Sequence, residues 1–356
     1  MSEPVYRSLA QTLHSLPNGF PPTETGVELR LLAKIFTPEE AALASVMRDE
    51  WEPAEAIAVR AGVEPKAAYN RLKAMARKGQ IYAGRRDRKL AFRLMPFAVG
   101  IYEEQLSRID EELALLFEEY YVQAQGAINR FEPALQRVIP VEETVSAGIE
   151  IYPYERASQM LDQAKAWGVR ECICRTQQKL IGKGCDHPLE ACLVFAPVEG
   201  VFDHSEVTRA ISREEAHRIL HEAEEAGLVH SPGNYRDGHF YICNCCTCCC
   251  AVLRSVAEFG MPPAMVSSGF VAVVDEAACA ACGDCLERCQ FGALAIVDDI
   301  CRVDSGRCVG CGLCATVCPS GALQLERLPE ATTTLPPVDL RDWKRQRAQT
   351  RGLVPD

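Results

Sequence analysis

Two groups of four cysteines in the C-terminal third share one spacing, C-x2-C-x2-C-x3-C. They are Cys279, Cys282, Cys285 and Cys289, then Cys308, Cys311, Cys314 and Cys318. Three cysteines at intervals of three wrap a tight loop around one face of a [4Fe-4S] cubane, and the fourth ligates the other cluster. We therefore expect cluster 1 on Cys279, Cys282, Cys285 and Cys318, and cluster 2 on Cys308, Cys311, Cys314 and Cys289.

This doubled motif resembles the bacterial 2[4Fe-4S] ferredoxin domain over about 55 residues. Gly283, Gly310 and Gly312 let the backbone bring its amides close to cluster sulfurs. Gln290 follows the first motif at a position that is usually proline. This difference changes how the chain leaves the loop, but it removes no ligand. Zinc or unpaired structural cysteines are the less favoured alternative. Cys301 falls outside both motifs, and we predict that it is a small buried hydrophobe.

Ten further cysteines lie upstream in two sets. The first set is Cys172, Cys174, Cys185 and Cys192, and the second is Cys243, Cys245, Cys246, Cys248, Cys249 and Cys250. Four thiolates of the first set suffice for one metal centre, and the second could supply another. Neighbouring residues in an extended segment point in opposite directions, so Cys245 and Cys246 are not expected to ligate one ion. The loop is therefore predicted to contribute to two sites, or to one site plus reactive thiols.

Three kinds of site compete for these ten thiols. One or two additional [4Fe-4S] clusters are favoured over a structural zinc site, which tolerates varied spacings. A redox dithiol or sulfur-relay site is the third alternative, because a nearby cation would lower a thiol pKa. The candidate cations are Arg175, Lys179 and Lys183. Histidines are weaker candidates: His187 is expected to be a loop hydrogen-bonder rather than a ligand, and His217 and His221 a solvated helix face rather than a metal pair.

Four stretches together resemble a family of 4Fe-4S ferredoxin-type proteins that carry a helix-turn-helix and belong to anaerobic bacteria and archaea. They are "LPNGFPPTETGVELRLLAKIFTPEEA", "CICR…GCDHPLEACLVF", "ICNCCTCCC" and "CVGCGLCATVCP", so the resemblance covers nearly the whole chain. Thr247 stands where glycine is expected between the cysteine pair and triplet. The resemblance implies iron–sulfur electron transfer in anaerobic metabolism.

Composition limits the classes of function. The chain has 356 residues, 48% of them hydrophobic and 24% charged, with a net charge of -11. This charge argues against general affinity for nucleic acid or anionic membranes. We find neither a signal-peptide core nor an apolar run of membrane-span length, and we expect a cytoplasmic protein. In a reducing compartment its 19 cysteines indicate metal rather than disulfides.

The N-terminal third predicts a winged helix. Thr37, Pro38 and Glu40 form a capping-box start to "TPEEAALASVM". Helices "EPAEAIAVRAG" and "EPKAAYNRLKAMARKG" follow, and then the β-like runs "QIYAG" and "KLAFRLM" joined by "RRDR". Ten Lys or Arg and one acid lie between residues 66 and 93. DNA contacts would be expected at Arg71, Lys73, Arg77 and Arg85 to Lys89, although a winged helix also serves protein contacts.

We predict an α+β fold with six segments: a lead-in (1–30), a winged helix (31–95), a connector (96–149), a cysteine-rich metal-binding domain (150–268), a 2[4Fe-4S] ferredoxin domain (269–328) and a basic, poorly ordered tail (329–356). The connector is expected to contain one long amphipathic helix from Pro96 to about Gln125.

No nucleotide-binding or hydrolase motif is found. The favoured function is therefore an electron carrier, or the electron-transfer subunit of an oxidoreductase, rather than an enzyme in itself. It would pass single low-potential electrons between redox partner proteins, and the connector could support a homodimer. The alternative is a redox-sensing transcription regulator that binds DNA through the winged helix.

Overall fold

The computed structural model describes residues 3–124, 130–260, 265–330 and 333–353, and they form an α+β protein. The chain divides into two compact units. The first comprises residues 1–128, 180–182 and 347–356, and the second comprises 129–179 and 183–346. Within the described residues, none of the helices is both long and apolar enough to cross a membrane.

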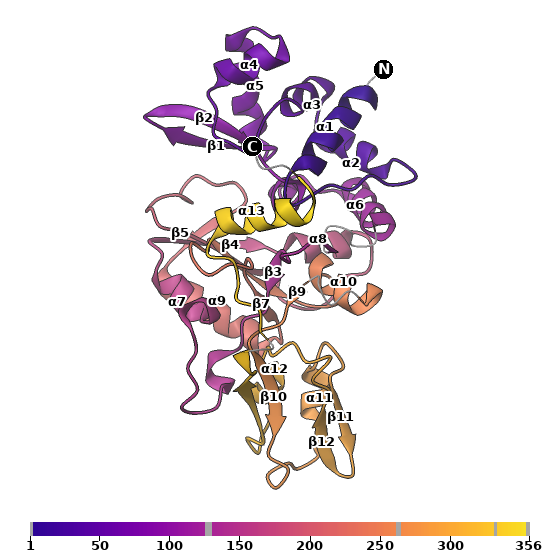
Figure 1. The fold of residues 1–356 in the computed structure, drawn as a ribbon, viewed down its shortest axis with the longest axis vertical. Helices are drawn as coiled ribbons and strands as arrows, with labels where there is room; N and C mark the ends of the chain where they lie inside the picture. The colour runs from indigo at the N-terminus through magenta and orange to yellow at the C-terminus, as the bar shows by residue number, and fades with distance from the viewer. Residues whose placement is uncertain (1–2, 125–129, 261–264, 331–332, 354–356) are drawn as a thin grey trace. The chain divides into compact units, whose positions relative to one another are not determined.

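The first unit is mainly helical (Figure 1). Its elements are α1 (Glu3–Ser15), α2 (Val27–Ile35), α3 (Pro38–Ala44), α4 (Ala54–Ala61), α5 (Pro65–Arg77), β1 (Ile81–Arg86), β2 (Lys89–Leu94) and α6 (Glu111–Ala124). The predicted capping box starts α3, where Thr37 accepts a hydrogen bond from the Glu40 amide and Glu40 accepts one from the Thr37 amide. Three helices and a β-hairpin thus follow in the expected order.

Two expectations for the chain outside the cysteine-rich segments are wrong. The single long connector helix is replaced by an irregular turn (Phe97–Ile101), a short 3-10 helix (Glu103–Gln105) and α6. The tail contains an ordered helix, α13 (Leu340–Thr350), because Trp343 and Arg347 are buried. The lead-in contains helix α1, which buries Leu9 and Leu13.

The second unit is organised around a five-stranded antiparallel sheet of order β6-β4-β5-β8-β7. The strands are β4 (Ala166–Glu171), β5 (Glu190–Ala196), β6 (Arg209–Ile211), β7 (Val229–Ser231) and β8 (Tyr241–Cys245). Helices α7 (Ala157–Asp162) and α9 (Arg213–Glu225) bury Met160, Leu161 and Ile219 with Leu193 and Ile242 of the sheet. Helices α8 (Ile173–Leu180) and α10 (Ala251–Phe259) follow the cysteine-bearing ends of β4 and β8.

The C-terminal part of this unit consists of two antiparallel strand pairs and two short helices (Figure 1). The pairs are β10 (Phe270–Val274) with β13 (Leu323–Arg327) and β11 (Leu294–Val297) with β12 (Ile300–Val303), and the helices are α11 (Asp284–Arg288) and α12 (Leu313–Thr316). A short parallel pair joins β3 (Gln136–Arg137) to β9 (Met265–Val266). The arrangement places both halves of the cysteine repeat in one core.

Candidate metal centres

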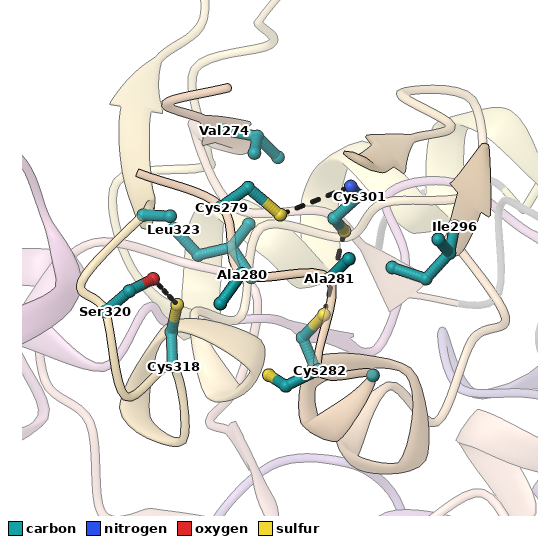
Figure 2. Close-up of a pocket in the computed structure, with 13 residues that line it drawn as sticks. Val274, Cys279, Ala280, Ala281, Cys282, Ile296, Cys301, Cys318, Ser320 and Leu323 are labelled. Atoms are coloured by element: carbon teal, nitrogen blue, oxygen red, sulfur yellow. Dashed lines mark hydrogen bonds between the residues drawn. The ribbon is translucent and has the colours of Figure 1, made fainter. Parts of the chain in front are cut away.

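The first ferredoxin-like pocket brings together the four cysteines expected to hold cluster 1. Cys279, Cys282 and Cys285 line it from the loop before α11 and from the helix itself, and Cys318 approaches from the end of α12 (Figure 2). Gly283 has a φ of 87°, a left-handed conformation that lets the loop turn directly into α11. Cys318, the fourth cysteine of the other motif, therefore lies beside the first three of this one.

The second pocket brings together the other four. It is lined by Cys289, Cys308, Cys311 and Cys314. Gly310 and Gly312 have positive φ, and a Cβ atom would lie 2.1 Å from the Phe270 carbonyl oxygen at Gly310 and 2.2 Å from Thr144 Oγ1 at Gly312. No larger residue fits either position without moving the loop. Each pocket is lined by its four expected ligands, which is the number of thiolates that a [4Fe-4S] cluster requires.

Cys301 has a larger role than that of a small buried hydrophobe. It is buried as expected, yet it lines the first pocket (Figure 2). Its Sγ lies 3.6 Å from Cys285 Sγ, and its amide donates a hydrogen bond of 3.4 Å to Cys279 Sγ. In the second pocket, the Ala293 amide donates a similar bond of 3.4 Å to Cys289 Sγ. Donors to ligand sulfur are among the features that set the reduction potential of a cluster.

Burial raises the pKa of several of these thiols. It raises the pKa of Cys311 to about 12, and it also raises the pKa of Cys314 and that of Cys285. For Cys318, burial acts in the same direction but hydrogen bonds from Ser320 and nearby amides outweigh it, so its pKa is lowered. Thiolates this deeply buried need a compensating positive charge, which bound iron would supply.

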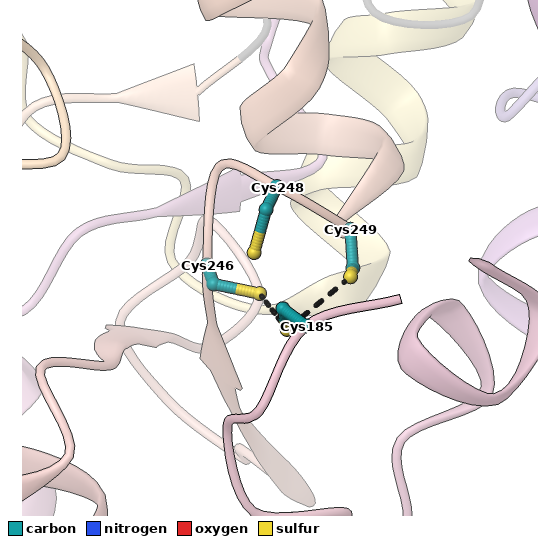
Figure 3. Close-up of side chains that lie close together, drawn as sticks. All are labelled: Cys185, Cys246, Cys248 and Cys249. Atoms are coloured by element: carbon teal, nitrogen blue, oxygen red, sulfur yellow. Dashed lines mark hydrogen bonds between the residues drawn. The ribbon is translucent and has the colours of Figure 1, made fainter. Parts of the chain in front are cut away.

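A compact four-thiol pocket lies in the cysteine-rich middle segment. Cys185, Cys246, Cys248 and Cys249 have their sulfur atoms within 4.8 Å of one another (Figure 3). Cys185 Sγ lies 4.0 Å from Cys246 Sγ and 3.5 Å from Cys249 Sγ. His187 Nδ1 is 3.3 Å from Cys185 Sγ, which agrees with the expected loop hydrogen bond. In the described part of the chain, this is the one group of three or more potential ligands that is so compact.

The remaining six cysteines are neighbours in the fold. Each of them interacts with two others, in the cyclic order Cys172, Cys174, Cys250, Cys245, Cys243, Cys192. The ring combines the end of β4, strands β5 and β8 and the start of α10. We refer to these residues as the six-thiol ring. Cys172, Cys245 and Cys250 are buried, and the other three are half-buried.

This arrangement corrects the grouping by position in the sequence. Cys185 leaves the first set to join three cysteines of the second, and Cys172, Cys174 and Cys192 join the other three. Sequence spacing could not show this because β5 and β8 are neighbours in the sheet although about 50 residues separate them. The expected separation of Cys245 from Cys246 is found: one lies in the six-thiol ring and the other in the four-thiol pocket.

Arg175 is a buried cation between the two thiol groups. It is 1% exposed, and its guanidinium donates to the carbonyls of Pro188 at 2.7 Å and Asn244 at 2.5 Å. The pKa of Cys172 is lowered by hydrogen bonds from Cys174 and Cys192 and then by the charge of Arg175. That of Cys246 is lowered to about 4 by a hydrogen bond from Cys249 and then by Arg175. Arg175 thus stabilises a thiolate in each group.

A polar network fixes strand β8 between its cysteines. Asn244 is fully buried, donates to the Ala191 carbonyl at 2.7 Å, and lies 2.7 Å from Nδ1 of buried His230. Nε2 of His230 lies 3.0 Å from a carboxylate oxygen of Glu224. Burial raises the pKa of Glu224, but hydrogen bonds from His230 and His221 outweigh it and the net shift is downward. The network orients Cys243 and Cys245 through the backbone on either side of Asn244.

The two departures from the expected motifs meet in one hydrogen bond. The Thr247 amide donates to Gln290 Oε1 at 2.7 Å, and the side-chain amide of Gln290 donates to the Gly227 carbonyl. Thr247 lies between two cysteines of the four-thiol pocket, and Gln290 follows Cys289 of the second ferredoxin-like pocket. Proline at 290 could form neither bond. The loop "CNCCTCCC" is therefore tied to the ferredoxin-like part.

Other candidate residues have local structural partners. His217 lies 2.8 Å from Asp162, and His221 lies 3.2 Å from Glu224, so each points to a carboxylate. In the basic segment, Lys78 pairs with buried Glu40 at 2.6 Å. Arg93 lies 3.7 Å from Asp49 and also covers Trp51 and Tyr82. The exposed cations of the segment are Lys66, Arg77, Arg85, Arg86, Arg88 and Lys89.

Sequence reasoning missed Asn244, His230, Glu224 and Gln290 as positioning residues, and it considered Arg175 only as one of three cations. One signal was available: "CNCC" continues an apolar run, so a polar Asn244 there needs partners if the strand is buried. The partners of Arg175 and Gln290 come from distant segments, and no local pattern predicts them.

Residues 302–324 match a family model described as the 4Fe-4S binding domain. No curated protein and no solved structure matches the chain. The match includes all four cysteines of the second motif. The C-terminal part therefore contains a ferredoxin-type iron–sulfur domain.

Proposed function

We propose that this protein passes single low-potential electrons between redox partner proteins through two [4Fe-4S] clusters. Cluster 1 would be held by Cys279, Cys282, Cys285 and Cys318, and cluster 2 by Cys308, Cys311, Cys314 and Cys289. The observation that carries the proposal is the exchange of the fourth cysteine between two adjacent pockets. In that ligand pattern two clusters lie next to each other, which suits electron transfer from one to the other.

The chain's own residues would tune these clusters. The amides of Cys301 and Ala293 donate to ligand sulfurs, and such bonds stabilise the more negative, reduced state. Cys282 is exposed, so cluster 1 has an edge open to a partner. The soft thiolate donor set fits iron–sulfur clusters, whose iron supplies the one-electron chemistry.

The test is electron paramagnetic resonance (EPR) of anaerobically purified, dithionite-reduced protein, together with reduction of an added acceptor. Two magnetically interacting [4Fe-4S]⁺ signals and transfer to the acceptor are expected. A single cluster in the ferredoxin-type domain, or two clusters that cannot exchange electrons with any acceptor dye, would contradict the proposal.

A second candidate is a redox-sensing regulator that binds DNA. It is favoured by one observation: Arg85, Arg86, Arg88 and Lys89 are all exposed around the tip of the β1–β2 hairpin. As the wing of a winged helix they would contact phosphates. This function requires duplex binding that weakens steeply with salt. An electron carrier requires neither the binding nor its salt dependence.

A further inference from the structure

The thiols of the middle segment are spaced in two different ways. In the four-thiol pocket all sulfur atoms lie within 4.8 Å of one another. Four thiolates around one zinc ion at 2.3 Å are about 3.8 Å apart, because the geometry is tetrahedral. The distances from Cys185 Sγ to Cys249 Sγ, 3.5 Å, and to Cys246 Sγ, 4.0 Å, lie on either side of that value. This pocket has the dimensions of a site for a single ion.

The ferredoxin-type pockets provide an internal comparison. In the described chain, neither quartet of cysteines lining them is gathered within 4.8 Å. The reason is that a cubane binds each thiolate through a separate iron, so its ligands lie further apart than those of one ion. Spacing therefore distinguishes the two kinds of centre within this protein, and the four-thiol pocket differs from the ferredoxin-type sites.

The thiols of the six-thiol ring, like those of the ferredoxin-type pockets, are less compactly grouped than those of the four-thiol pocket. Each thiol of the ring has two thiol neighbours, yet among the described residues no three of them have their sulfur atoms within 4.8 Å of one another. One zinc ion would use four thiolates and leave two aside. No member of the ring is set apart in this way, since each has two thiol neighbours. A polynuclear centre with six terminal ligands uses them all.

A second observation indicates an anionic ligand beside the ring. Arg175 is 1% exposed and lies next to Cys172 of the ring and Cys246 of the pocket. The guanidinium interacts with the Cys246 thiol, but its Nε is buried and no acceptor in hydrogen-bond geometry is found for that atom in the described structure. A buried guanidinium N–H with no acceptor is costly. A sulfide or thiolate of a bound cluster would accept from it.

We propose that the middle segment holds two different metal centres: one zinc ion in the four-thiol pocket, and in the six-thiol ring an iron–sulfur cluster larger than a cubane, with Arg175 as the cation shared by both. This assignment goes beyond the proposed electron transfer and does not depend on it. Zinc is redox-inert, so it would fix the loop through Cys246, Cys248 and Cys249.

The ring also lies beside the ferredoxin-type domain. Cys245 and Cys250 share a hydrophobic cluster with Leu313, and Cys243 and Cys311 both pack against that cluster. Cys311 lines the second ferredoxin-type pocket. If the proposed electron transfer holds, the ring cluster is the next centre for an electron leaving cluster 2.

The test is metal analysis of the full-length protein purified without oxygen. We expect one zinc per chain, with four sulfur neighbours at about 2.3 Å by zinc X-ray absorption. With one iron per terminal thiolate, the ring and two cubanes together require about fourteen iron atoms or more. A total of about twelve iron atoms per chain would contradict a cluster with six ligands, and a total of about eight would contradict any iron in the six-thiol ring. Iron in place of zinc in the four-thiol pocket would contradict the zinc assignment.

Two variants serve as each other's control. Cys248→Ser alters the exposed member of the four-thiol pocket and should lose zinc while all iron is retained. Cys192→Ser alters the ring and should lose only the iron in excess of eight while zinc is retained. Loss of both metals in both variants would show a single centre and refute the proposal.

If Cys192→Ser does not fold, Mössbauer spectroscopy of the unaltered protein decides, since a larger cluster adds iron sites distinct from those of cubanes. Absence of the ferredoxin-type EPR signals with zinc and ring iron in place would contradict the proposed function alone.

Discussion

Gln290→Ala tests how the loop of the four-thiol pocket is held. The variant removes the acceptor of the Thr247 amide and the donor to the Gly227 carbonyl. A net hydrogen bond contributes about 1 kcal/mol, and both residues are partly exposed, so the free energy of unfolding should fall by about 1–2 kcal/mol. Loss of a residue that orients metal ligands typically lowers metal affinity about 10–100-fold. We expect that loss at the pocket because Thr247 lies between Cys246 and Cys248.

The assay is competition of anaerobic protein with a chelator, with zinc and iron release followed separately. Only the metal of the four-thiol pocket should become easier to remove, and the ferredoxin-type EPR signals should persist. Gln290→Glu is the matched control: its carboxylate still accepts from Thr247 but cannot donate to Gly227, so an intermediate affinity is expected. Unchanged metal affinity in Gln290→Ala would show that the bond does not position the loop.

Four further outcomes follow from the structure. Cys311→Ala should eliminate the EPR signal of cluster 2, and an unchanged spectrum would refute its place as a ligand. Combined replacement of Arg85, Arg86 and Arg88 by Ala should weaken partner or DNA binding, measured by titration, with iron content unchanged; loss of iron would instead assign the hairpin a structural role. Burial raises the pKa of Glu40, but hydrogen bonds from Lys78, Thr37 and Gln80 outweigh burial, so the pKa is lowered from its ordinary value of 4.5. The ionised Glu40 carboxylate therefore stabilises the folded protein above pH 4.5, and this stabilisation is lost as the pH falls through the lower pKa of the folded state. Glu40→Gln should therefore flatten the acid dependence in denaturant unfolding, and an unchanged slope would exclude Glu40 as its source. Arg175→Met should make thiolates harder to form in both groups and lower zinc and total iron together, in a protein that circular dichroism shows to be folded. Unchanged contents of both metals would refute the role of Arg175 as the shared cation.

The sequence by itself determined the features that depend on short separations along the chain. The cysteine repeat predicted two sets of four ligands because cysteines at intervals of three face one centre, and the structure brings the same eight cysteines together in two pockets. The start of α3 was predictable because a capping box acts within four residues. The opposite directions of Cys245 and Cys246 follow from strand geometry alone.

Only the tertiary structure decided which of the ten middle cysteines belong together. The neighbouring strands β5 and β8 place Cys192 beside Cys243, and the turn after β8 reaches back to Cys185. The order of strands in a sheet is not encoded in local spacing, so the division into a pocket and a ring could not be read from the chain. Arg175 and Gln290 act across long separations for the same reason: a buried charge or amide finds its partners only when distant segments have packed.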